Sequence, residues 1–467
     1  MEIVRALFGE LKWGGAARRC ILLMASCFAF ACPLALHAAG KPNIVYLIAD
    51  DLGSKDVGFQ GGKVPTPNLD RLAASGATLR NFYVQPFSSQ TRAALLTGRY
   101  PMRYGLQTMS IIPSSRFGLP TEERTLAQGL KDAGYRTAFI GKWQLGHASA
   151  EFWPTRRGFD YFYGTLSGEV DDQVRKSNSN DWRRNEQPAK EDGLVTQLLA
   201  KDAVNQIHKH DLATPLFLVV AFTAPGTDAS AQTGRGYAAG VRALDDAIGQ
   251  VVDALEKKKM GSNTLIVFHS DSGGALPTKF ATGDNDVRET GADNGLYRGG
   301  KGSLYEGGLR VPALAVWPER IKEKTVVTSL LHVTDMYPTL LNVAGFTIDQ
   351  PKKLDGLDAW PTLTEGRLSP RQDVLLNVEA FRGAIRVGEW KLIVRATLPG
   401  KLELFDIAND PEESQNQAET YPERVKGLLK RLNDLAYEMA TPLYLEEIGQ
   451  AHSAPLPIYW GDNPLRR

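Results

Sequence analysis

Uninterrupted apolar runs, rich in β-branched residues, recur between residues 43 and 269. Three of them cover residues 43–49, 216–222 and 265–269, and the first run ends at Asp50 and Asp51. A strand that is buried on both faces of a parallel sheet has this composition, because neither face meets water. The pattern therefore predicts three central parallel strands.

Segments with helical periodicity alternate with these runs. The longest segment, residues 237–257, is amphipathic and lies between two of the predicted strands. Further elements are predicted as follows: helices at 68–75 and 126–133, a helix that starts within 92–97, and a strand at 136–140. Alternating strands and helices favour an α/β fold with a doubly wound sheet.

The pattern changes near residue 370. Residues 383–394 and 401–405 have the composition of short antiparallel strands, and residues 422–439 carry apolar side chains at helical spacing. We therefore predict a main α/β domain over residues 40–370. A smaller C-terminal domain, made of an antiparallel sheet and a helix, is expected over residues 371–467.

The N-terminus has the layout of a secretory signal peptide. Arg18 and Arg19 precede the apolar run 20–36, and small residues follow at 38–40. We predict a signal peptide over residues 1–39, and hence a periplasmic or secreted protein with no stable membrane association after cleavage. An uncleaved anchor and a lipid-anchored form are the alternatives, although the apolar run is short for a membrane span.

Composition narrows the class of protein. The chain has 467 residues, of which 43% are hydrophobic, so it is long enough for a large core. Its net charge of +1 offers no basic excess for a nucleic acid, and no nucleic-acid partner is expected. The three cysteines, Cys20, Cys27 and Cys32, all lie in the predicted signal peptide. The mature protein would therefore have neither a disulfide nor a cysteine-ligated zinc site.

Three acidic residues follow predicted strands. Asp50 and Asp51 follow the first apolar run, and Asp271 follows the third. Ligands of open α/β sheets bind at the carboxyl ends of the strands, and carboxylate oxygens suit Ca²⁺ or Mg²⁺. The alternative is that each aspartate caps the N-terminus of a helix. The residues alone leave both interpretations open.

Several blocks of the sequence resemble landmarks of the type I sulfatases. In chain order they are KPNIVYLIADDLG at 41–53, PTPNLDRLAASG at 65–76, SSQTRAALLTGR at 88–99, PTRRGFD at 154–160, SDSGG at 270–274 and RGGKGSLYEGGLRVP at 298–312. The resemblance extends to about residue 418 and is similar to the arylsulfatase B-like branch. It implies an alkaline phosphatase-like α/β fold with a doubly wound mixed sheet. The implied activity is metal-dependent hydrolysis of a sulfate ester, either an aryl sulfate or a sulfated glycan.

The resemblance also implies roles for individual residues. The implied catalytic residues are Ser88, Arg92, Lys142 and Gln144. The implied ligands of the substrate sulfate are Arg92, Lys142 and Lys301. The implied metal ligands are Asp50, Asp51, Asp271, Ser272 and Ser88, with calcium as the expected ion and magnesium as the alternative.

The sequence departs from the family pattern at five positions. Ser88 replaces the cysteine that the family converts to formylglycine, Gln90 replaces a proline, and Ser272 replaces an asparagine. Gln144 and Gly226 stand where the family has histidines, and neither side chain can transfer a proton near neutral pH. We therefore predict that Ser88 stays unmodified and that hydrolysis is slow.

Two other functions fit the same residues. One is a non-catalytic pseudosulfatase that binds sulfated ligands through Arg92, Lys142 and Lys301. The other is a phosphate or phosphonate ester hydrolase in which unmodified Ser88 is the nucleophile. His147 and His269 are close enough in sequence to replace the missing histidines, but we interpret them as ordinary polar residues near strand ends.

Overall fold

The computed structural model describes residues 40–168, 181–226, 236–276, 291–347, 350–396 and 398–450. The described residues from Lys41 onward belong to one compact unit. The predicted signal peptide lies outside the described residues. Among the residues that are described, no helix is both long enough and apolar enough to cross a membrane.

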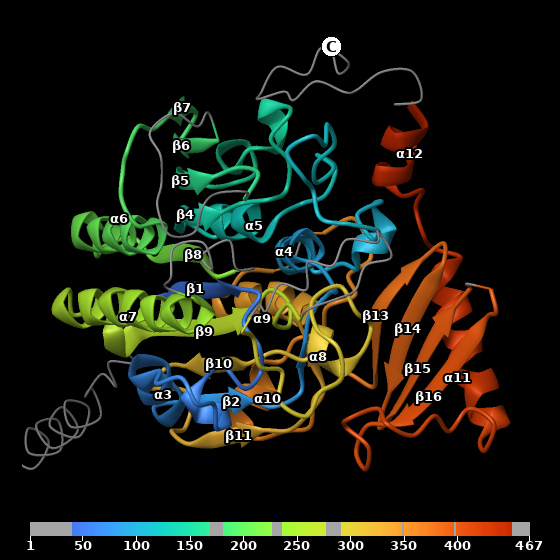
Figure 1. Ribbon diagram of the computed structural model, residues 1–467. Helices are drawn as coiled ribbons and strands as arrows, with labels where there is room; N and C mark the ends of the chain where they lie inside the picture. The colour runs from blue at the N-terminus through green and yellow to red at the C-terminus, as the bar shows by residue number, and fades with distance from the viewer. Residues whose placement is uncertain are drawn as a thin grey trace, which may run out of the picture. The chain divides into compact units, whose positions relative to one another are not determined.

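A ten-stranded sheet forms the centre of this compact unit. Its strand order is β11-β2-β10-β9-β1-β8-β4-β5-β6-β7, which Figure 1 shows from bottom to top. The bounds of the strands are β1 (Asn43–Asp50), β2 (Ala77–Leu79), β4 (Arg136–Lys142), β5 (Tyr161–Thr165), β6 (Trp182–Arg184), β7 (Gln187–Pro188), β8 (Leu216–Pro225), β9 (Thr264–Ser270), β10 (Ala313–Val316) and β11 (Thr325–Val327). Strands β9, β1, β8, β4 and β5 are mutually parallel, whereas β10, β6 and β7 pair in antiparallel fashion. The sheet is therefore mixed, as predicted.

Helices cover both faces of this sheet. Alternate residues of β1 point to opposite faces: Val45 and Leu47 join one apolar core, and Ile44 and Tyr46 join the other. The first core is built with α3 (Pro67–Ala74), α6 (Val195–Lys209) and α7 (Gly236–Lys257). The second is built with α4 (Ser88–Thr97), α5 (Leu126–Asp132), α9 (Met336–Val343) and α10 (Trp360–Glu365). The predicted doubly wound α/β fold is confirmed.

The predicted elements of this part are found near their predicted positions, with one shift. Helix α4 begins at Ser88 and not at Arg92. The residues of its first turn are polar, so the apolar pattern gives no sign of a helix there, yet every residue of α4 is buried. It ends at Gly98, whose φ of 66° is the left-handed conformation that glycine adopts readily.

A separate four-stranded antiparallel sheet follows near the C-terminus. Its strands are β13 (Asp373–Glu379), β14 (Arg382–Val387), β15 (Trp390–Arg395) and β16 (Lys401–Asp406), and α11 (Pro422–Ala436) packs on it. The predicted strand segment 383–394 is divided into β14 and β15, because the chain turns at Gly388 with φ 55°. Strand β13 had not been predicted. The domain boundary at residue 370 stays a prediction, because the structure places both sides of it in one unit.

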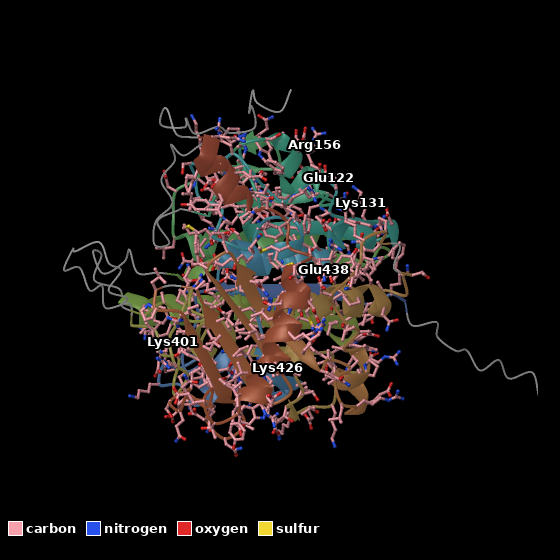
Figure 2. All side chains as sticks on the ribbon, turned by 90° about the vertical axis from the view of Figure 1, so that its right-hand side faces the viewer. Glu122, Lys131, Arg156, Lys401, Lys426 and Glu438 are labelled. Carbon is pink, nitrogen blue, oxygen red and sulfur yellow. The ribbon has the colours of Figure 1, made fainter. Side chains whose placement is uncertain are left out.

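Charged side chains lie at the surface of the C-terminal sheet region. Figure 2 shows Lys426 on α11 and Lys401 at the start of β16, both at the surface.

The remaining short elements are β3 (Phe82–Tyr83), β12 (Leu331–His332), α8 (Glu306–Leu309), α12 (Leu443–Gln450), and the 3-10 helices Gly58–Gln60, Pro101–Arg103, Ala150–Phe152, Pro154–Arg156, Gly261–Asn263 and Val333–Asp335.

Candidate functional site

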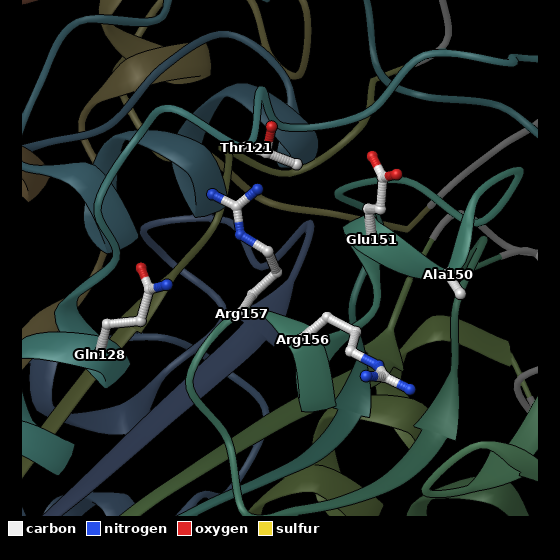
Figure 3. A pocket seen from close by; sticks show the side chains of 6 residues that line it. All are labelled: Thr121, Gln128, Ala150, Glu151, Arg156 and Arg157. Atoms are coloured by element: carbon white, nitrogen blue, oxygen red, sulfur yellow. The ribbon is translucent and has the colours of Figure 1, made fainter. Parts of the chain in front are cut away.

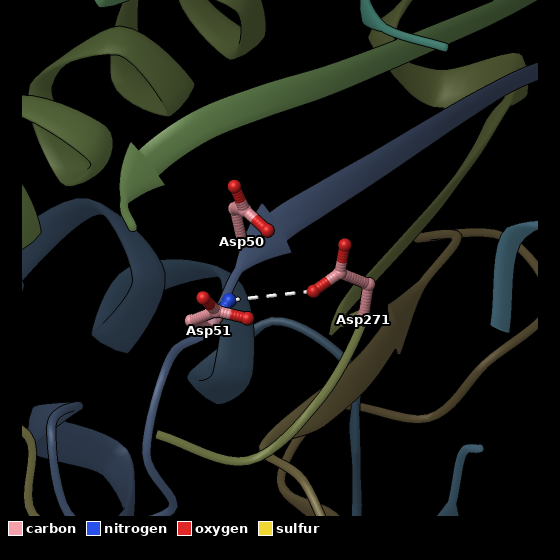
Figure 4. A group of neighbouring side chains, drawn as sticks. All are labelled: Asp50, Asp51 and Asp271. Carbon is pink, nitrogen blue, oxygen red and sulfur yellow. Dashed lines mark hydrogen bonds between the residues drawn. The ribbon is translucent and has the colours of Figure 1, made fainter. Parts of the chain in front are cut away.

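Three aspartates meet at the carboxyl ends of β1 and β9. Ala49 lies opposite Ser270 in the parallel register, so Asp50 and Asp51 come beside Asp271. Ligand oxygens of the three side chains lie within 4.8 Å of one another, and all three residues are buried (Figure 4). The backbone N–H of Asp51, which has a left-handed φ of 59°, donates to Asp271 Oδ1 at 3.3 Å. Carboxylate oxygens that converge in this way can hold a divalent cation.

Each of the three carboxylates also contacts one cationic side chain. Lys142 Nζ lies 2.9 and 2.8 Å from the two oxygens of Asp50. Lys301 Nζ lies 2.5 Å from Asp51 Oδ2, and Arg92 donates to Asp271 Oδ2 at 3.1 and 2.8 Å. Buried carboxylates repel one another strongly when they are uncompensated. Each carboxylate is compensated by its own cation, which offsets this repulsion. The pairing also brings together Arg92, Lys142 and Lys301, the three residues predicted to bind the sulfate.

The three cations come from separate elements and differ in access. Lys142 ends β4, Arg92 lies in α4, and Lys301 lies in the glycine-rich segment before α8. The Lys301 side chain is 24% exposed, against 6% for Lys142 and 3% for Arg92, so Lys301 is the most accessible of the three to solvent. Burial opposes the charge of Lys301, but the neighbouring aspartates raise its pKa well above its ordinary value. Lys301 therefore stays charged throughout the neutral range.

Two serine hydroxyls complete the group. Ser88 is the first residue of α4 and donates to Asp50 Oδ1 at 3.4 Å. Its position at a helix N-terminus favours negative charge beside its hydroxyl. Ser272 donates to Asp51 Oδ1 at 2.7 Å. The structure therefore brings Ser88 and Ser272 to the same carboxylates as the three predicted cations.

Three of the positions that depart from the family pattern differ in what they contact. Gly226 directly follows β8, has a φ of 68°, and donates its N–H to the carbonyl of Asp50 at 3.0 Å. Gln144 is also buried, with a φ of 52° and its N–H on the carbonyl of Leu166 at 3.0 Å. Gln90 instead donates to the carbonyl of Gln107 at 2.5 Å. The Gln90 side chain therefore hydrogen bonds to the interior and not to the three aspartates.

The two histidines near these positions make packing contacts. His269 is fully buried between the rings of Tyr46 and Phe82, at centroid distances of 5.4 and 5.2 Å. Burial lowers the pKa of His269 to about 4, so its imidazole is neutral at pH 7. Burial also lowers the pKa of His147, whose Nε2 lies 2.9 Å from the carbonyl of Pro113. These surroundings agree with their interpretation as ordinary polar residues.

No sequence pattern marks one supporting residue, Asp181. Asp181 accepts the backbone N–H groups of Leu166 and Ser167, each at 2.8 Å, and so fixes the turn after β5. Gly168 in this turn lies against Lys142, because a Cβ at residue 168 would meet Lys142 Cε at 2.7 Å. No periodicity or motif marks Asp181, since its role depends on a contact between separate segments.

A cavity of about 320 Å³ lies between α5 and the 3-10 helices that precede β5. Figure 3 shows the six residues that line it: Thr121, Gln128, Ala150, Glu151, Arg156 and Arg157. Arg157 belongs to the PTRRGFD block and donates to the carbonyls of Leu119, Pro120 and Glu123 at 2.9, 3.1 and 2.7 Å. None of the lining residues is a predicted site residue. Arg157 therefore supports the fold by tying two loops together.

Comparison with known proteins gives a consistent result. The sequence pattern of the sulfatase family matches residues 42–346, and that of the N-sulphoglucosamine sulphohydrolase C-terminal region matches residues 295–438. The chain is 35% identical to arylsulfatase J of Mus musculus, over 84% of this chain and 75% of that protein. It is 35% identical to N-acetylgalactosamine-6-sulfatase of Homo sapiens, over 72% and 68%. The crystal structure of Ps i-CgsB in complex with k-i-k-neocarrahexaose is also similar, with 31% identity, a TM-score of 0.76, and coverage of 86% of this chain and 94% of that one.

Proposed function

The chain belongs to the sulfatase family and is a sulfate ester hydrolase, and we propose that its substrate is a sulfated glycan. The convergence of Lys142, Lys301 and Arg92 on one group of carboxylates carries the proposal, because it supplies a ready anion site beside Ser88. Similarity to an N-acetylgalactosamine-6-sulfatase and to a structure with a bound neocarrahexaose supports a sugar as the alcohol part of the ester. The comparisons do not favour a pseudosulfatase or a phosphate ester hydrolase.

We propose that calcium binds at the three aspartates, with magnesium as the alternative. The donors fit such an ion, because Asp50, Asp51 and Asp271 offer buried, converging carboxylate oxygens. The hydroxyls of Ser88 and Ser272 adjoin the same carboxylates and would add neutral oxygen ligands. A bound divalent cation would supply positive charge that stabilises negative charge on the sulfate oxygens.

The chain's own residues would bind and orient the ester. We propose that Lys301, as the most exposed of the three cations, meets the sulfate first, and that Lys142 and Arg92 fix its orientation. During hydrolysis the bond between sulfur and the glycan oxygen breaks, water supplies the new oxygen on sulfur, and the alcohol takes a proton. Gln144, which stands where the family has a histidine, would at most donate a hydrogen bond to the glycan oxygen and cannot supply its proton. General acid–base help contributes about 10²- to 10⁴-fold, so turnover would be correspondingly slow.

Export of the protein remains part of the proposal. The arrangement of Arg18, Arg19 and the apolar run 20–36 supports a signal peptide and a periplasmic or secreted location. Sequencing the N-terminus of protein from its native host tests this point directly. A mature N-terminus near residue 40 is expected, and an intact residue 1 in the exported protein would contradict it.

A substrate panel tests the activity. The purified protein, with and without calcium, is incubated with sulfated mono- and oligosaccharides, an aryl sulfate and the matching phosphate esters, and released anions are measured by ion chromatography. We expect slow sulfate release from at least one glycan, and loss of that release in Lys301→Ala. Release of phosphate but not sulfate, or sulfate release that Lys301→Ala leaves unchanged, would contradict the proposal.

A further inference from the structure

Residues of the C-terminal sheet and of the loop after it contact the segment that carries Lys301. This segment, residues 298–306, is contacted at both ends. Arg298 donates to the carbonyl of Glu413 at 3.0 Å, near its start. At its end, the hydroxyl of Tyr305 contacts both oxygens of Glu403, at 3.1 and 3.0 Å. The position of this segment therefore depends on residues more than 90 positions further along the chain.

Among these contacts from the C-terminal sheet, the one nearest in sequence to Lys301 is made by Arg382. Its guanidinium donates to the carbonyl of Gly302, the next residue after Lys301, at 2.7 Å. Arg382 is the first residue of β14 and lies opposite Glu379, the last residue of β13, across a two-residue turn. The Glu379 carboxylate, whose side chain is 8% exposed, accepts the Arg382 Nε–H and orients the guanidinium. The Arg382 guanidinium, at the end of the β13–β14 hairpin, is thus an oriented hydrogen-bond donor to the segment 298–306.

The same guanidinium also lies beside the residue that precedes Ser88. Its central carbon is 6.0 Å from the centre of the Phe87 ring. Gly302 in turn donates its N–H to the carbonyl of Pro86 at 2.8 Å, and a Cβ at residue 302 would meet the Phe87 ring at 2.9 Å. The segments that carry Ser88 and Lys301 are therefore packed against each other at the point where Arg382 binds.

The Lys301 segment needs such a restraint. Gly299, Gly300 and Gly302 surround Lys301, and glycine loses more conformational freedom on ordering than any other residue. A hydrogen bond from a charged guanidinium is stronger than one between neutral groups. Because the Lys301 ammonium lies only 2.5 Å from Asp51, a small shift of the segment changes this contact directly.

We propose that Arg382 is a positioning residue, which fixes the place of Lys301 relative to Ser88 through the carbonyl of Gly302. The proposal rests on the proposed function insofar as Lys301 binds the substrate sulfate. Arg382 need not touch the substrate. It restrains the backbone on one side of Lys301, so that the ammonium is held ready for the anion. Displacing a positioned group by about 1 Å can cost about 10² in rate.

Four variants test the proposal. Arg382→Ala removes the donor, Arg382→Lys keeps a charge but loses the fork of the guanidinium, and Glu379→Gln weakens its orientation. The matched control is Arg431→Ala, which removes an arginine that pairs with Asp373 at 2.7 Å on the same sheet. In Arg382→Ala we expect faster backbone hydrogen exchange in residues 299–303, by at least tenfold, and at least tenfold weaker binding of inorganic sulfate. Arg382→Lys should recover part of both properties, and Arg431→Ala should match the wild type.

The two measurements separate this proposal from the proposed function. Hydrogen exchange of residues 299–303 reports positioning even in a protein that hydrolyses no ester. If exchange in Arg382→Ala equals that in Arg431→Ala, while thermal unfolding shows that both variants are folded, Arg382 is not a positioning residue. If exchange rises but no sulfate ester is cleaved by the wild type, the proposed function fails and the positioning role stands. With an active wild type, the loss in Arg382→Ala should fall mainly on kcat/KM, and an unchanged kcat/KM would overturn the proposal.

Discussion

Two clusters of buried carboxylates and cationic side chains in this protein differ in their surroundings. The first, the site cluster, pairs Asp50, Asp51 and Asp271 with Lys142, Lys301 and Arg92. The second, the support cluster, joins α8 to the C-terminal sheet and contains Glu306, Glu413, Lys391, Arg310, Arg386 and Tyr83. In it, Lys391 contacts Glu306 at 2.9 Å and Glu413 at 2.8 Å. Both clusters neutralise buried carboxylates with nearby cations.

The clusters differ in access and in how their acids are arranged. The side chains of Lys391, Glu306 and Glu413 have no exposed surface, and Tyr83 donates to the second oxygen of Glu306 at 2.6 Å. In the site cluster, by contrast, the Lys301 side chain is 24% exposed. Among the described residues, only the site cluster gathers three acidic side chains close enough to hold a metal ion. The site cluster therefore differs from the support cluster by the convergence of three acidic side chains and by the accessibility of Lys301, and not by burial alone.

The largest expected effect comes from breaking the support cluster. Replacing Lys391 with Met leaves Glu306 and Glu413 without their shared cation in a fully buried place. Removing one partner of a buried ion pair typically costs about 3–5 kcal/mol, and we expect a loss of that size in the free energy of unfolding. Denaturant unfolding measures it. Lys426→Met on α11, where the pair with Glu423 is exposed, is the control and should change little. Equal stability of the two variants would show that the support cluster does not hold the sheet in place.

The site cluster should respond to a cation where the support cluster does not. Calcium at about 100 times its Kd would raise the free energy of unfolding by about 2.7 kcal/mol. In Asp51→Ala this response should be lost, because one of the three converging carboxylates is gone. Asp253→Ala, which removes an exposed aspartate paired with Arg71, should keep it. Thermal unfolding with calcium and with chelator measures the response. Identical responses of Asp51→Ala and wild type would rule out the proposed metal site.

The support cluster, in turn, should show a pH dependence of its own. Burial raises the pKa of Glu413 from its ordinary 4.5 to about 7, with Glu306 adding repulsion and Lys391 opposing the shift. The folded protein therefore holds a proton that the unfolded chain has lost, so stability falls as pH rises from 4.5 to about 7. Relative to the wild type, Glu413→Gln should gain roughly 1–3 kcal/mol on going from pH 5 to pH 8. Exposed Glu412→Gln is the control, and parallel pH curves for all three proteins would contradict the expectation.

For the mass of the peptide that contains Ser88 we expect no change at all, because Ser88 is predicted to stay unmodified. Formylglycine made from serine would be lighter by two hydrogens. Because Gln90 replaces the proline of the family pattern, we expect the peptide that contains residue 88 to have the mass of unmodified serine. Peptide mass spectrometry of protein from the native host measures this, with the same protein made in a host without a maturation enzyme as the reference. An aldehyde in place of the Ser88 hydroxyl in most of the native protein would contradict the prediction.

The central strands and the carboxylates at their ends could be predicted from the sequence. Strands β1, β8 and β9 are buried along almost their whole length, so each leaves an uninterrupted apolar run. The parallel register then places Asp50 beside Asp271, because both follow strands that end at the same edge. These are properties of short segments together with a general rule about sheets. The resemblance to a family added the cations Lys142 and Lys301.

Contacts between distant segments could not be predicted. Nothing in the sequence around Arg382 indicates that its side chain reaches the carbonyl of Gly302, which lies 80 residues earlier. Lys391 looks like an alternating polar residue of a strand, whereas its side chain is wholly buried against two glutamates. The first turn of α4 reads as a polar loop, because Ser88 and Gln90 face buried polar partners and not an apolar core. In each case the side chain depends on tertiary packing that local periodicity does not record.

The pairing of β1 with β9 also has a consequence for the order of assembly. The contact between Asp51 and Asp271 joins residues 220 positions apart, and Lys301 lies 250 positions from its partner Asp51. Contacts of such long range form late, because a long loop must close first. During synthesis, 220 residues, about half of the chain, are added between Asp51 and Asp271. Metal binding at the site cluster would therefore report that at least the first 272 of the 467 residues have been made and folded.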